Sequence, residues 1–164
     1  EFFHFHDERV VFFCRGVLET VRKLGWAPDV VHCQGWMTSL VPLYLKKAFS
    51  EDPIFSETKV VYSLYEETID GQISNDLASK SIVNGVSEED LAIIKEANLL
   101  NLHKLAITHA DAVIMGQSKV SSELDRFLKK AGKRTLPFQA EEAYVKAYND
   151  LYDEILDEEA VALS

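Results

Sequence analysis

The sequence predicts an α/β domain with a mostly parallel sheet, and two observations carry that prediction. Short runs rich in β-branched residues alternate along the chain with longer stretches whose apolar residues recur at helical spacing. Strands and helices that alternate in this way form parallel sheets through right-handed helical crossovers. The length of 164 residues suits one domain with a sizeable core.

In the first half of the chain, a helix is expected over Asp7–Leu24, and a glycine and a proline then end it. Its expected apolar positions are Val10, Cys14, Val17, Val21 and Leu24. "DVVHC" predicts a strand, and "WMTSLVPLYLKKAF" predicts a second helix, in which Pro42 fits only the first turn or a kink. "KVVYSLY" predicts a second strand. Because both apolar runs lack alternation, we expect Val30–Cys33 and Val60–Leu64 to be neighbouring or near-neighbouring central strands.

The second half is expected to alternate in the same way. Tyr65–Val86 is polar and indicates an irregular excursion, and Ser87–His109 predicts one or two helices broken near Asn98. "DAVIMG" predicts a third strand, "SKVSSELDRFLKKAG" a helix that begins at Ser118, and "RTLPF" a short strand at an edge. "AEEAYVKAYNDLYDEIL" predicts a final amphipathic helix. The residues expected on one face of that helix are Tyr144, Tyr148 and Leu151.

The formal net charge of −10 argues against nucleic-acid binding and against binding to anionic membranes, because both need a basic surface. No apolar run approaches the ~20 residues of a membrane span. The start, "EFFHFHDERVVFF", has neither a Met nor a basic region before an apolar stretch, so we expect the interior of a longer chain and no signal peptide. Cys14 and Cys33 are too few for a disulfide framework or a zinc knuckle, which predicts a reducing, cytoplasmic compartment.

Common motifs for phosphate binding and nucleophilic catalysis are absent from the sequence, which lacks G-x-G-x-x-G, G-x-x-x-x-G-K-[ST] and G-x-S-x-G. The segment "HFHDE", His4 to Glu8, brings two imidazoles and two carboxylates together. A His-x-His pair on a strand can bind a metal ion, but the segment offers too few further ligands. We favour a solvated segment over a metal site, and we expect neither a metal nor another cofactor.

The stretch "HCQGW" stands where a strand ends, and open α/β sheets bind their ligands at the carboxyl ends of parallel strands. His32 can donate a hydrogen bond to a hydroxyl or phosphate, Gln34 can pair with sugar hydroxyls, and Gly35 permits a tight turn. The alternative, which the chemistry alone favours, is that His32 is a core histidine with satisfied hydrogen bonds and Trp36 a packing residue.

The second expected strand also ends in polar residues, in the sequence "SLYEE". Glu66 and Glu67 are adjacent, so their carboxylates point to different sides of the strand. They therefore do not form an acid–base pair by themselves.

Residues Asp7 to Leu128 resemble the amino-terminal domain of bacterial glycogen synthases and plant starch synthases. The resemblance rests on "DERVVFFCRGVLETVRKLGWAPDVVHCQGWMTSLVPLYLKKAF" and "KVVYSLY", and the chain is most similar to the short, single-domain forms of Bacteroidetes-type bacteria. The family has a strand P-D-V-V-H-x-H-D-W-H followed by L-x-P-x-Y-L, then a strand K-V-V-Y-T-I-H-N, then A-D-x-I-x-x-V-S. Order, spacing and residue types agree.

This resemblance implies a Rossmann-like three-layer α/β domain with a mostly parallel sheet, the amino-terminal half of a two-domain glycosyltransferase fold. The family activity is elongation of an α-1,4-glucan from ADP-glucose, in a cleft whose other side supplies most contacts to the nucleotide sugar. Residues 1–157 are expected to form this domain without its amino-terminal part, which carries a glycine-rich lysine loop in the family. Residues 158–164 are expected to be a disordered acidic tail.

The chain departs from the family pattern at the polar site positions. His32 matches the first histidine of the strand motif, and Trp36 is retained. Gln34, Gly35 and Met37 stand in place of the second histidine, the aspartate and a third histidine.

The second strand shows the same kind of departure. Tyr65 stands where the family has the histidine that contacts the transferred glucose, Glu66 replaces its asparagine, and Gln117 falls near the family serine. The apolar packing residues of the family pattern are retained, whereas its polar site residues are replaced. No catalytic residue is assigned, and the candidate substrate-binding residues are His32, Gln34, Trp36, Tyr65 and Glu66.

We therefore expect a synthase-family domain that has no transferase activity on its own, as a fragment or a degenerate relative. The alternative is a non-catalytic module that binds an α-glucan or a protein, which glucan binding without ADP-glucose would distinguish. A third interpretation is an active enzyme completed by a separate subunit that carries the missing nucleotide-binding half. The expected partners are accordingly an α-glucan and that missing half, with neither nucleic acid nor membrane.

Overall fold

The computed structural model describes the backbone of residues 6–162 and the side chains of residues 6–157. Its sheet has four parallel strands in the order β1-β2-β3-β4. The strands are β1 (Val30–Gln34), β2 (Lys59–Leu64), β3 (Ala112–Met115) and β4 (Arg134–Leu136). The predicted α/β class with a parallel sheet is confirmed, and each strand lies within the stretch predicted for it.

The two strands predicted to be central are neighbours, but only one of them is central. β1 pairs with β2 in a register that sets His32 opposite Val61, and β2 also pairs with β3. β1 itself lies at an edge of the sheet, so the prediction of a central β1 is wrong. Missing alternation reports that both faces of a strand are covered, whereas it says nothing about hydrogen bonds along the strand's outer side.

Most helices lie in the stretches predicted for them, with shifted ends, but α3 lies in the segment predicted to be irregular, and the stretch from Ser87 to Ala97 contains only a 3-10 helix. The helices are α1 (His6–Leu24), α2 (Val41–Lys47), α3 (Leu77–Lys80), α4 (Leu99–His109), α5 (Ser122–Ala131) and α6 (Tyr144–Ala162), with short 3-10 helices η1 (Trp36–Thr38) and η2 (Ala92–Ile94). Pro42 lies in the first turn of α2, and Asn98 caps the start of α4 by accepting from the Asn101 amide. The predicted break near Asn98 is thereby confirmed.

Capping explains why α5 begins later than the predicted Ser118. The Ser121 side chain accepts a hydrogen bond from the Leu124 amide, so the helix starts at Ser122. At its other end Gly132 adopts the left-handed conformation, with φ 64°, that ends many helices. The cap residue, rather than the first polar residue of the stretch, sets the boundary.

The buried stripe of α1 differs in part from the predicted one. Val10, Cys14 and Leu18, each four residues apart, are buried, whereas Val17 and Leu24 are 38% and 72% exposed. On a straight helix, residues four apart shift around the axis in one direction and residues seven apart shift in the opposite direction. The buried face follows the four-residue spacing, so Val17 and Leu24, which follow Val10 at seven-residue spacing, lie away from it. The prediction that Val17 and Leu24 belong to the buried apolar face is therefore wrong.

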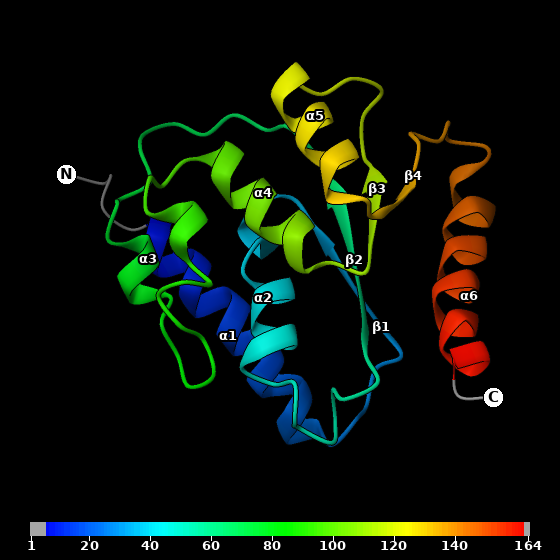
Figure 1. Cartoon of the computed structure of the whole chain (residues 1–164), viewed down its shortest axis with the longest axis horizontal. Helices are drawn as coiled ribbons and strands as arrows, with labels where there is room; N and C mark the ends of the chain where they lie inside the picture. The colour runs from blue at the N-terminus through cyan, green and yellow to red at the C-terminus, as the bar shows by residue number, and fades with distance from the viewer. Residues whose placement is uncertain (1–5, 163–164) are drawn as a thin grey trace.

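The sheet separates two layers of helices, as Figure 1 shows, with α6 on one side and α1 to α4 on the other. Alternation along β2 builds both layers, because Val60, Tyr62 and Leu64 join the large core while Val61 joins a second cluster under α6. In that second cluster Leu151 and Ile155 of α6 pack on the sheet. The predicted three-layer arrangement is confirmed.

The final helix begins four residues after the predicted Ala140 and continues past Asp157 to Ala162 in its backbone. Between β4 and α6 the chain runs through an exposed connection that includes Pro137 and Phe138. This connection carries α6 across to the otherwise open second face of the sheet (Figure 1).

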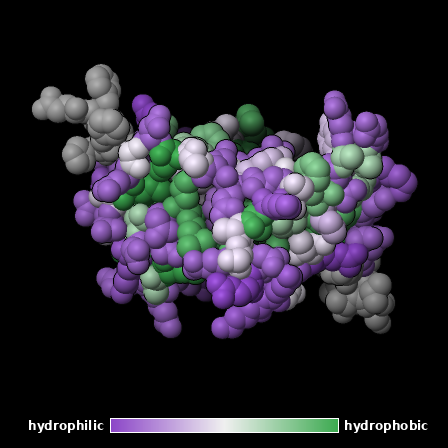
Figure 2. Space-filling model, turned by 90° about the horizontal axis from the view of Figure 1, so that it is seen from above, coloured by the Kyte–Doolittle hydropathy of each residue, from purple (hydrophilic) through white to green (hydrophobic). Residues whose placement is uncertain are grey.

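The surface seen from above is mainly hydrophilic with separate apolar patches, as Figure 2 shows. Such a surface agrees with a formal net charge of −10. Over the part of the chain that the structure describes, none of the helices combines the length and the apolar character that crossing a bilayer requires.

Candidate functional site

The candidate residues gather at the carboxyl ends of β1, β2 and β3, which face the same edge because the strands are parallel. β1 ends at Gln34, β2 leads into Tyr65, and β3 leads into Gly116. This edge is where open α/β sheets place ligands. Side chains at this edge can bind a ligand only if their hydrogen-bonding groups are accessible and not already used within the protein.

His32 has both ring nitrogens engaged inside the protein. Nδ1 lies 2.6 Å from the Tyr152 hydroxyl, and Nε2 lies 2.6 Å from Ser63 Oγ. Burial lowers the pKa of His32 from its ordinary value, which keeps the ring neutral. A neutral imidazole donates from one nitrogen and accepts at the other, so both of its capacities are used here. His32 is therefore the satisfied histidine of the favoured interpretation.

The partners of His32 come from α6, which sequence reasoning did not connect to the site. Tyr148 and Tyr152 each contact the His32 ring edge to face, with ring centres 5.7 and 5.8 Å apart. The Tyr148 hydroxyl hydrogen-bonds with Ser63 and Tyr65, and burial raises its pKa and that of Tyr152. The helical spacing of the tyrosines was the available signal, but only the fold shows which strand they cover.

Ser63 and His32 are as close as a catalytic nucleophile and its general base, but a substrate could not reach the Ser63 hydroxyl. Their hydrogen bond is 2.6 Å long, as in activated serines. However, Ser63 is 0% exposed, and the third member of the set is the Tyr152 hydroxyl, where a carboxylate would orient the imidazole. This group consequently anchors α6 to the sheet and offers no path for a substrate.

Tyr65 packs directly on the backbone where β3 ends. A Cβ atom on Gly116 would lie 2.5 Å from Tyr65 Cζ, so the ring occupies the space that any larger residue at position 116 would need. The ring is half-buried and its hydroxyl contacts Tyr148. Tyr65 thus fills the edge between β2 and β3.

Glu66 and Glu67 bind backbone amides in two different elements. A Glu66 oxygen accepts from the Ser121 amide at 2.6 Å, at the start of α5, and its own amide donates to Gln117 Oε1 at 2.9 Å. A Glu67 oxygen accepts from the Trp36 amide at 3.1 Å, at the start of η1. The prediction that the two carboxylates diverge is confirmed. Both stabilise helix starts, where negative charge is favourable.

The "HCQGW" stretch bends sharply after β1. Gly35 has φ 74°, and a Cβ atom there would lie 2.9 Å from a Glu67 oxygen, so the predicted need for glycine is confirmed. Trp36 is half-buried against the large core and meets the His6 ring edge to face at 6.0 Å. Gln34 is exposed at the end of the strand. Among the five candidates, Gln34 alone is both exposed and without a hydrogen bond in the described residues.

A second buried histidine lies behind this edge. His103 of α4 is 1% exposed, and its Nδ1 lies 2.7 Å from the Tyr62 hydroxyl. Burial lowers the pKa of His103 to about 4 and raises the pKa of Tyr62 well above its ordinary value. His103 Nε2 is buried without a hydrogen-bond partner among the described residues. This pair was not predicted, because a histidine within a helical pattern carries no distinctive signal.

The acidic start of α1 is engaged in ion pairs. Lys80 Nζ lies 2.7 Å from Asp7 and 3.1 Å from Glu8, and His6 Nε2 lies 3.3 Å from the Asp70 carbonyl. His4 lies outside the described residues. Within the described part of the chain, His, Cys, Asp and Glu form no group of three that could hold a metal ion.

Comparison with known proteins gives the family. The family model described as "Starch synthase catalytic domain" matches residues 1–132. The chain is 34% identical over 106 residues to a glycogen synthase of Chlorobium limicola, which covers 65% of this chain and 21% of that protein. It is 31% identical over 137 residues to a glycogen synthase of Chlorobaculum tepidum, covering 77% of this chain and 28% of that protein.

A solved structure shares the fold. The catalytic domain of starch synthase IV from Arabidopsis thaliana, bound to ADP and acarbose, superposes with a TM-score of 0.62 at 18% identity. The match covers 81% of this chain and 29% of that one. This chain thus spans only a fifth to somewhat over a quarter of the relatives it matches. The parallel sheet, the strand motifs and the match over residues 1–132 agree, and the chain belongs to the glycogen and starch synthase family.

Proposed function

We propose that this chain is a synthase-family domain that does not, by itself, transfer glucose from ADP-glucose to an α-1,4-glucan. The observation that carries the proposal is that polar groups at the strand ends are used by the fold. His32 binds Ser63 and Tyr152, and Glu66 binds the start of α5. A substrate would have to displace these internal hydrogen bonds.

Electrostatics supports the same conclusion. Breaking the bond between glucose and a nucleoside diphosphate needs donors that neutralise the phosphates, and losing one such donor typically costs ~10²–10³ in rate. Glu66 and Glu67, which are exposed, instead place negative charge at this edge, and negative charge there repels a pyrophosphate. The nucleotide-binding half lies outside these residues, and the positioning that such a half supplies can be worth ~7–11 kcal/mol.

The test is incorporation of labelled glucose from ADP-glucose into glycogen by the purified chain, with a full-length glycogen synthase as positive control. We expect incorporation at background for the chain and for the variant Tyr65→His with Glu66→Asn, because the reversion restores neither the other half nor access past α6. Turnover within about a hundredfold of ordinary enzyme rates, on the order of 10 s⁻¹, would refute the proposal. Turnover that appears only with an added nucleotide-binding half would favour the two-subunit enzyme.

Binding of an α-glucan is the second candidate, and the exposed Gln34 beside the half-buried Trp36 is the feature that favours it. An amide next to an indole suits sugar hydroxyls and ring faces. We propose that this binding is weak, since Gln34 is the one candidate residue that is both exposed and without a hydrogen bond among the described residues. Cys14 and Cys33 are buried free thiols, which suits the proposed cytoplasmic location.

A further inference from the structure

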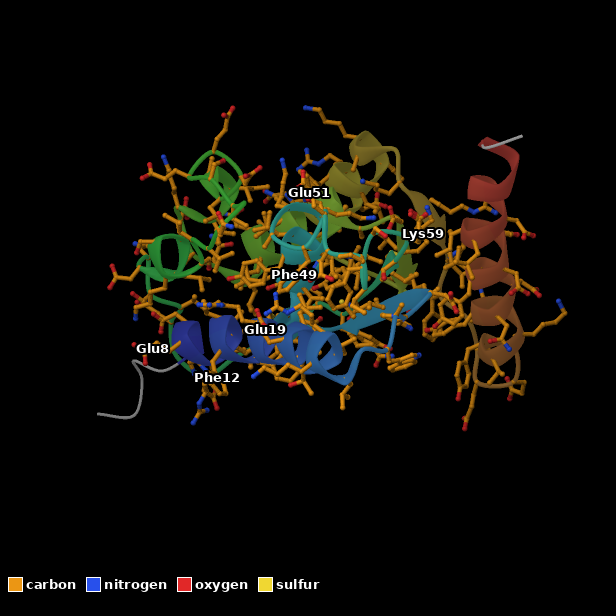
Figure 3. All side chains as sticks on the ribbon, turned by 90° about the horizontal axis from the view of Figure 1, so that it is seen from below. Glu8, Phe12, Glu19, Phe49, Glu51 and Lys59 are labelled. Carbon is orange, nitrogen blue, oxygen red and sulfur yellow. The ribbon has the colours of Figure 1, made fainter. Side chains whose placement is uncertain are left out.

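α6 is held to the sheet by a contact surface that is separate from the large core. The buried residues of this surface come from α6, β2 and β3, and they are Leu151, Ile155, Val61, Ala112 and Ile114. The large core lies on the first face of the sheet and, among the described residues, includes none from α6. Figure 3 shows α6 apart from the other helices, with side chains filling the space between it and the sheet. Release of α6 therefore leaves the large core in place.

The polar part of this contact surface is centred on His32. Its Nδ1 lies 2.6 Å from the Tyr152 hydroxyl of α6, and its Nε2 lies 2.6 Å from Ser63 Oγ of β2. The rings of Tyr148 and Tyr152 meet the imidazole edge to face. One imidazole thus joins α6 to two strands.

A neutral His32 ring suits this arrangement better than a protonated one. A neutral imidazole accepts a hydrogen bond at one nitrogen and donates from the other, whereas a protonated ring donates from both. On protonation, the hydroxyl that had donated to the ring has to reverse, and its hydrogen then needs another acceptor. Burial also disfavours the charged ring, which lowers the pKa of His32.

The described neighbours of the ring offer no negative charge that would stabilise a protonated His32. From α6 they are the hydroxyls of Tyr148 and Tyr152, whose pKa values burial raises, so both remain neutral. From β2 the neighbour is Ser63, with the Tyr65 hydroxyl beyond it. The two glutamates that follow Tyr65 are bonded to backbone amides at the starts of α5 and η1.

We propose that protonation of His32 releases α6 from the sheet as a unit, while the large core stays folded. A ring that is harder to protonate under α6 than in solvent makes α6 harder to keep docked once it is protonated. Docking is therefore strongest above pH 6.5, the ordinary value for a histidine, and weakens as the pH falls below it. The device goes beyond the proposed function, because it opens the strand end in acid alone.

Amide hydrogen exchange of the labelled full chain, followed by nuclear magnetic resonance between about pH 5 and pH 8, tests the proposal. A released single helix is marginal in water, so its amides then exchange with solvent. We expect the α6 amides to open at a lower free energy than those of α1 and β2. Their protection is expected to fall below pH 6.5, by up to about tenfold for each pH unit until the docked ring is protonated.

Variants separate His32 from the other buried histidines. His32→Gln keeps a side chain that donates and accepts but does not titrate, so the protection of α6 is expected to become independent of pH. His109→Gln is the matched control: burial lowers the pKa of His109 in α4 as well, and the pH dependence of α6 is expected to remain. Tyr152→Phe removes one hydrogen bond to the ring and is expected to lower α6 protection at neutral pH by about two- to tenfold. Tyr144→Phe, at an exposed tyrosine of the same helix, leaves it unchanged.

Each of three results would overturn the proposal. The first is α6 protection that does not change with pH in the unaltered chain, and the second is a pH dependence that persists in His32→Gln. The third is exchange of the α6 amides at the same free energy as those of α1 and β2, which means that α6 opens only when the whole fold unfolds. Where His32→Gln does not fold, equal effects of Tyr152→Phe and Tyr144→Phe overturn it. No sugar nucleotide takes part in these measurements, so their failure is distinct from a failure of the proposed function.

Discussion

At the scale of single residues, the strand-end side chains of this domain have acquired structural partners. Where the family has a histidine that contacts the transferred glucose, Tyr65 packs on Gly116. Where it has an asparagine, Glu66 binds the start of α5. His32, which the family retains, is shared between Ser63 and Tyr152. The substitutions at Tyr65 and Glu66 are therefore explained by contacts within the fold, whereas Gln34 is exposed and its substitution has no structural explanation.

His103 makes folding stability depend on pH in a defined direction. Its pKa is about 4 in the folded protein, below its ordinary value of 6.5, because burial disfavours the charged ring. Between these values the unfolded chain binds a proton that the folded protein does not. The free energy of unfolding is therefore expected to fall as the pH falls from 6.5 to 4, by about 3 kcal/mol from this group.

Urea denaturation of the protein and of His103→Leu at several pH values measures this contribution. The variant leaves the Tyr62 hydroxyl without its partner at every pH, so its stability is lower throughout. Its loss of stability between pH 6.5 and 4 should nevertheless be shallower. Burial also lowers the pKa of His32 and His109, so some pH dependence remains in the variant. Parallel pH profiles for the two proteins would contradict the assignment.

At the scale of elements, α6 completes the domain by covering the second face of the sheet. Leu151 and Ile155 are 3% and 4% exposed, and they pack against Val61, Ala112 and Ile114. Tyr148 and Tyr152 of the same helix pack edge to face against the His32 ring. α6 therefore contributes both apolar burial and a hydrogen bond to His32 at the strand ends.

Leu151→Ala is expected to lower the free energy of unfolding by ~2–5 kcal/mol, because it leaves a cavity between α6 and the sheet. Leu24→Ala is the matched control, since Leu24 is 72% exposed and its truncation should change stability by about 0.5 kcal/mol or less. Equal effects of the two substitutions, measured by urea denaturation, would show that α6 does not pack as described.

Most of these elements could be predicted from the sequence, because local patterns encode them. The runs rich in β-branched residues locate β1, β2 and β3, and Gly132 marks the end of α5. Strand position within the sheet could not be predicted, since side-chain patterns report covered faces and not the hydrogen bonds of an edge. The partners of His32 could not be predicted either, because Tyr152 is 120 residues away in the chain.

At the scale of the whole molecule, this chain is a three-layer α/β domain of the glycogen and starch synthase family that spans a limited part of its relatives. The resemblance to the family predicts both the parallel sheet and the apolar residues that pack against it. Of the changed residues, Tyr65 and Glu66 contact neighbouring elements, which are distant from them in the sequence. We therefore propose that the residues at the carboxyl end of β1 stabilise the fold and do not bind a substrate.

The most direct test of that claim is nuclear magnetic resonance of the His32 ring nitrogens in uniformly labelled protein, assigned with His32→Gln. The account predicts a neutral ring in one fixed tautomer at neutral pH, because both nitrogens are held by Tyr152 and Ser63. It also predicts that millimolar ADP-glucose or maltoheptaose leaves both nitrogen shifts unchanged. A saturable movement of either nitrogen signal on addition of ADP-glucose or of maltoheptaose would contradict the account and identify His32 as part of a working site.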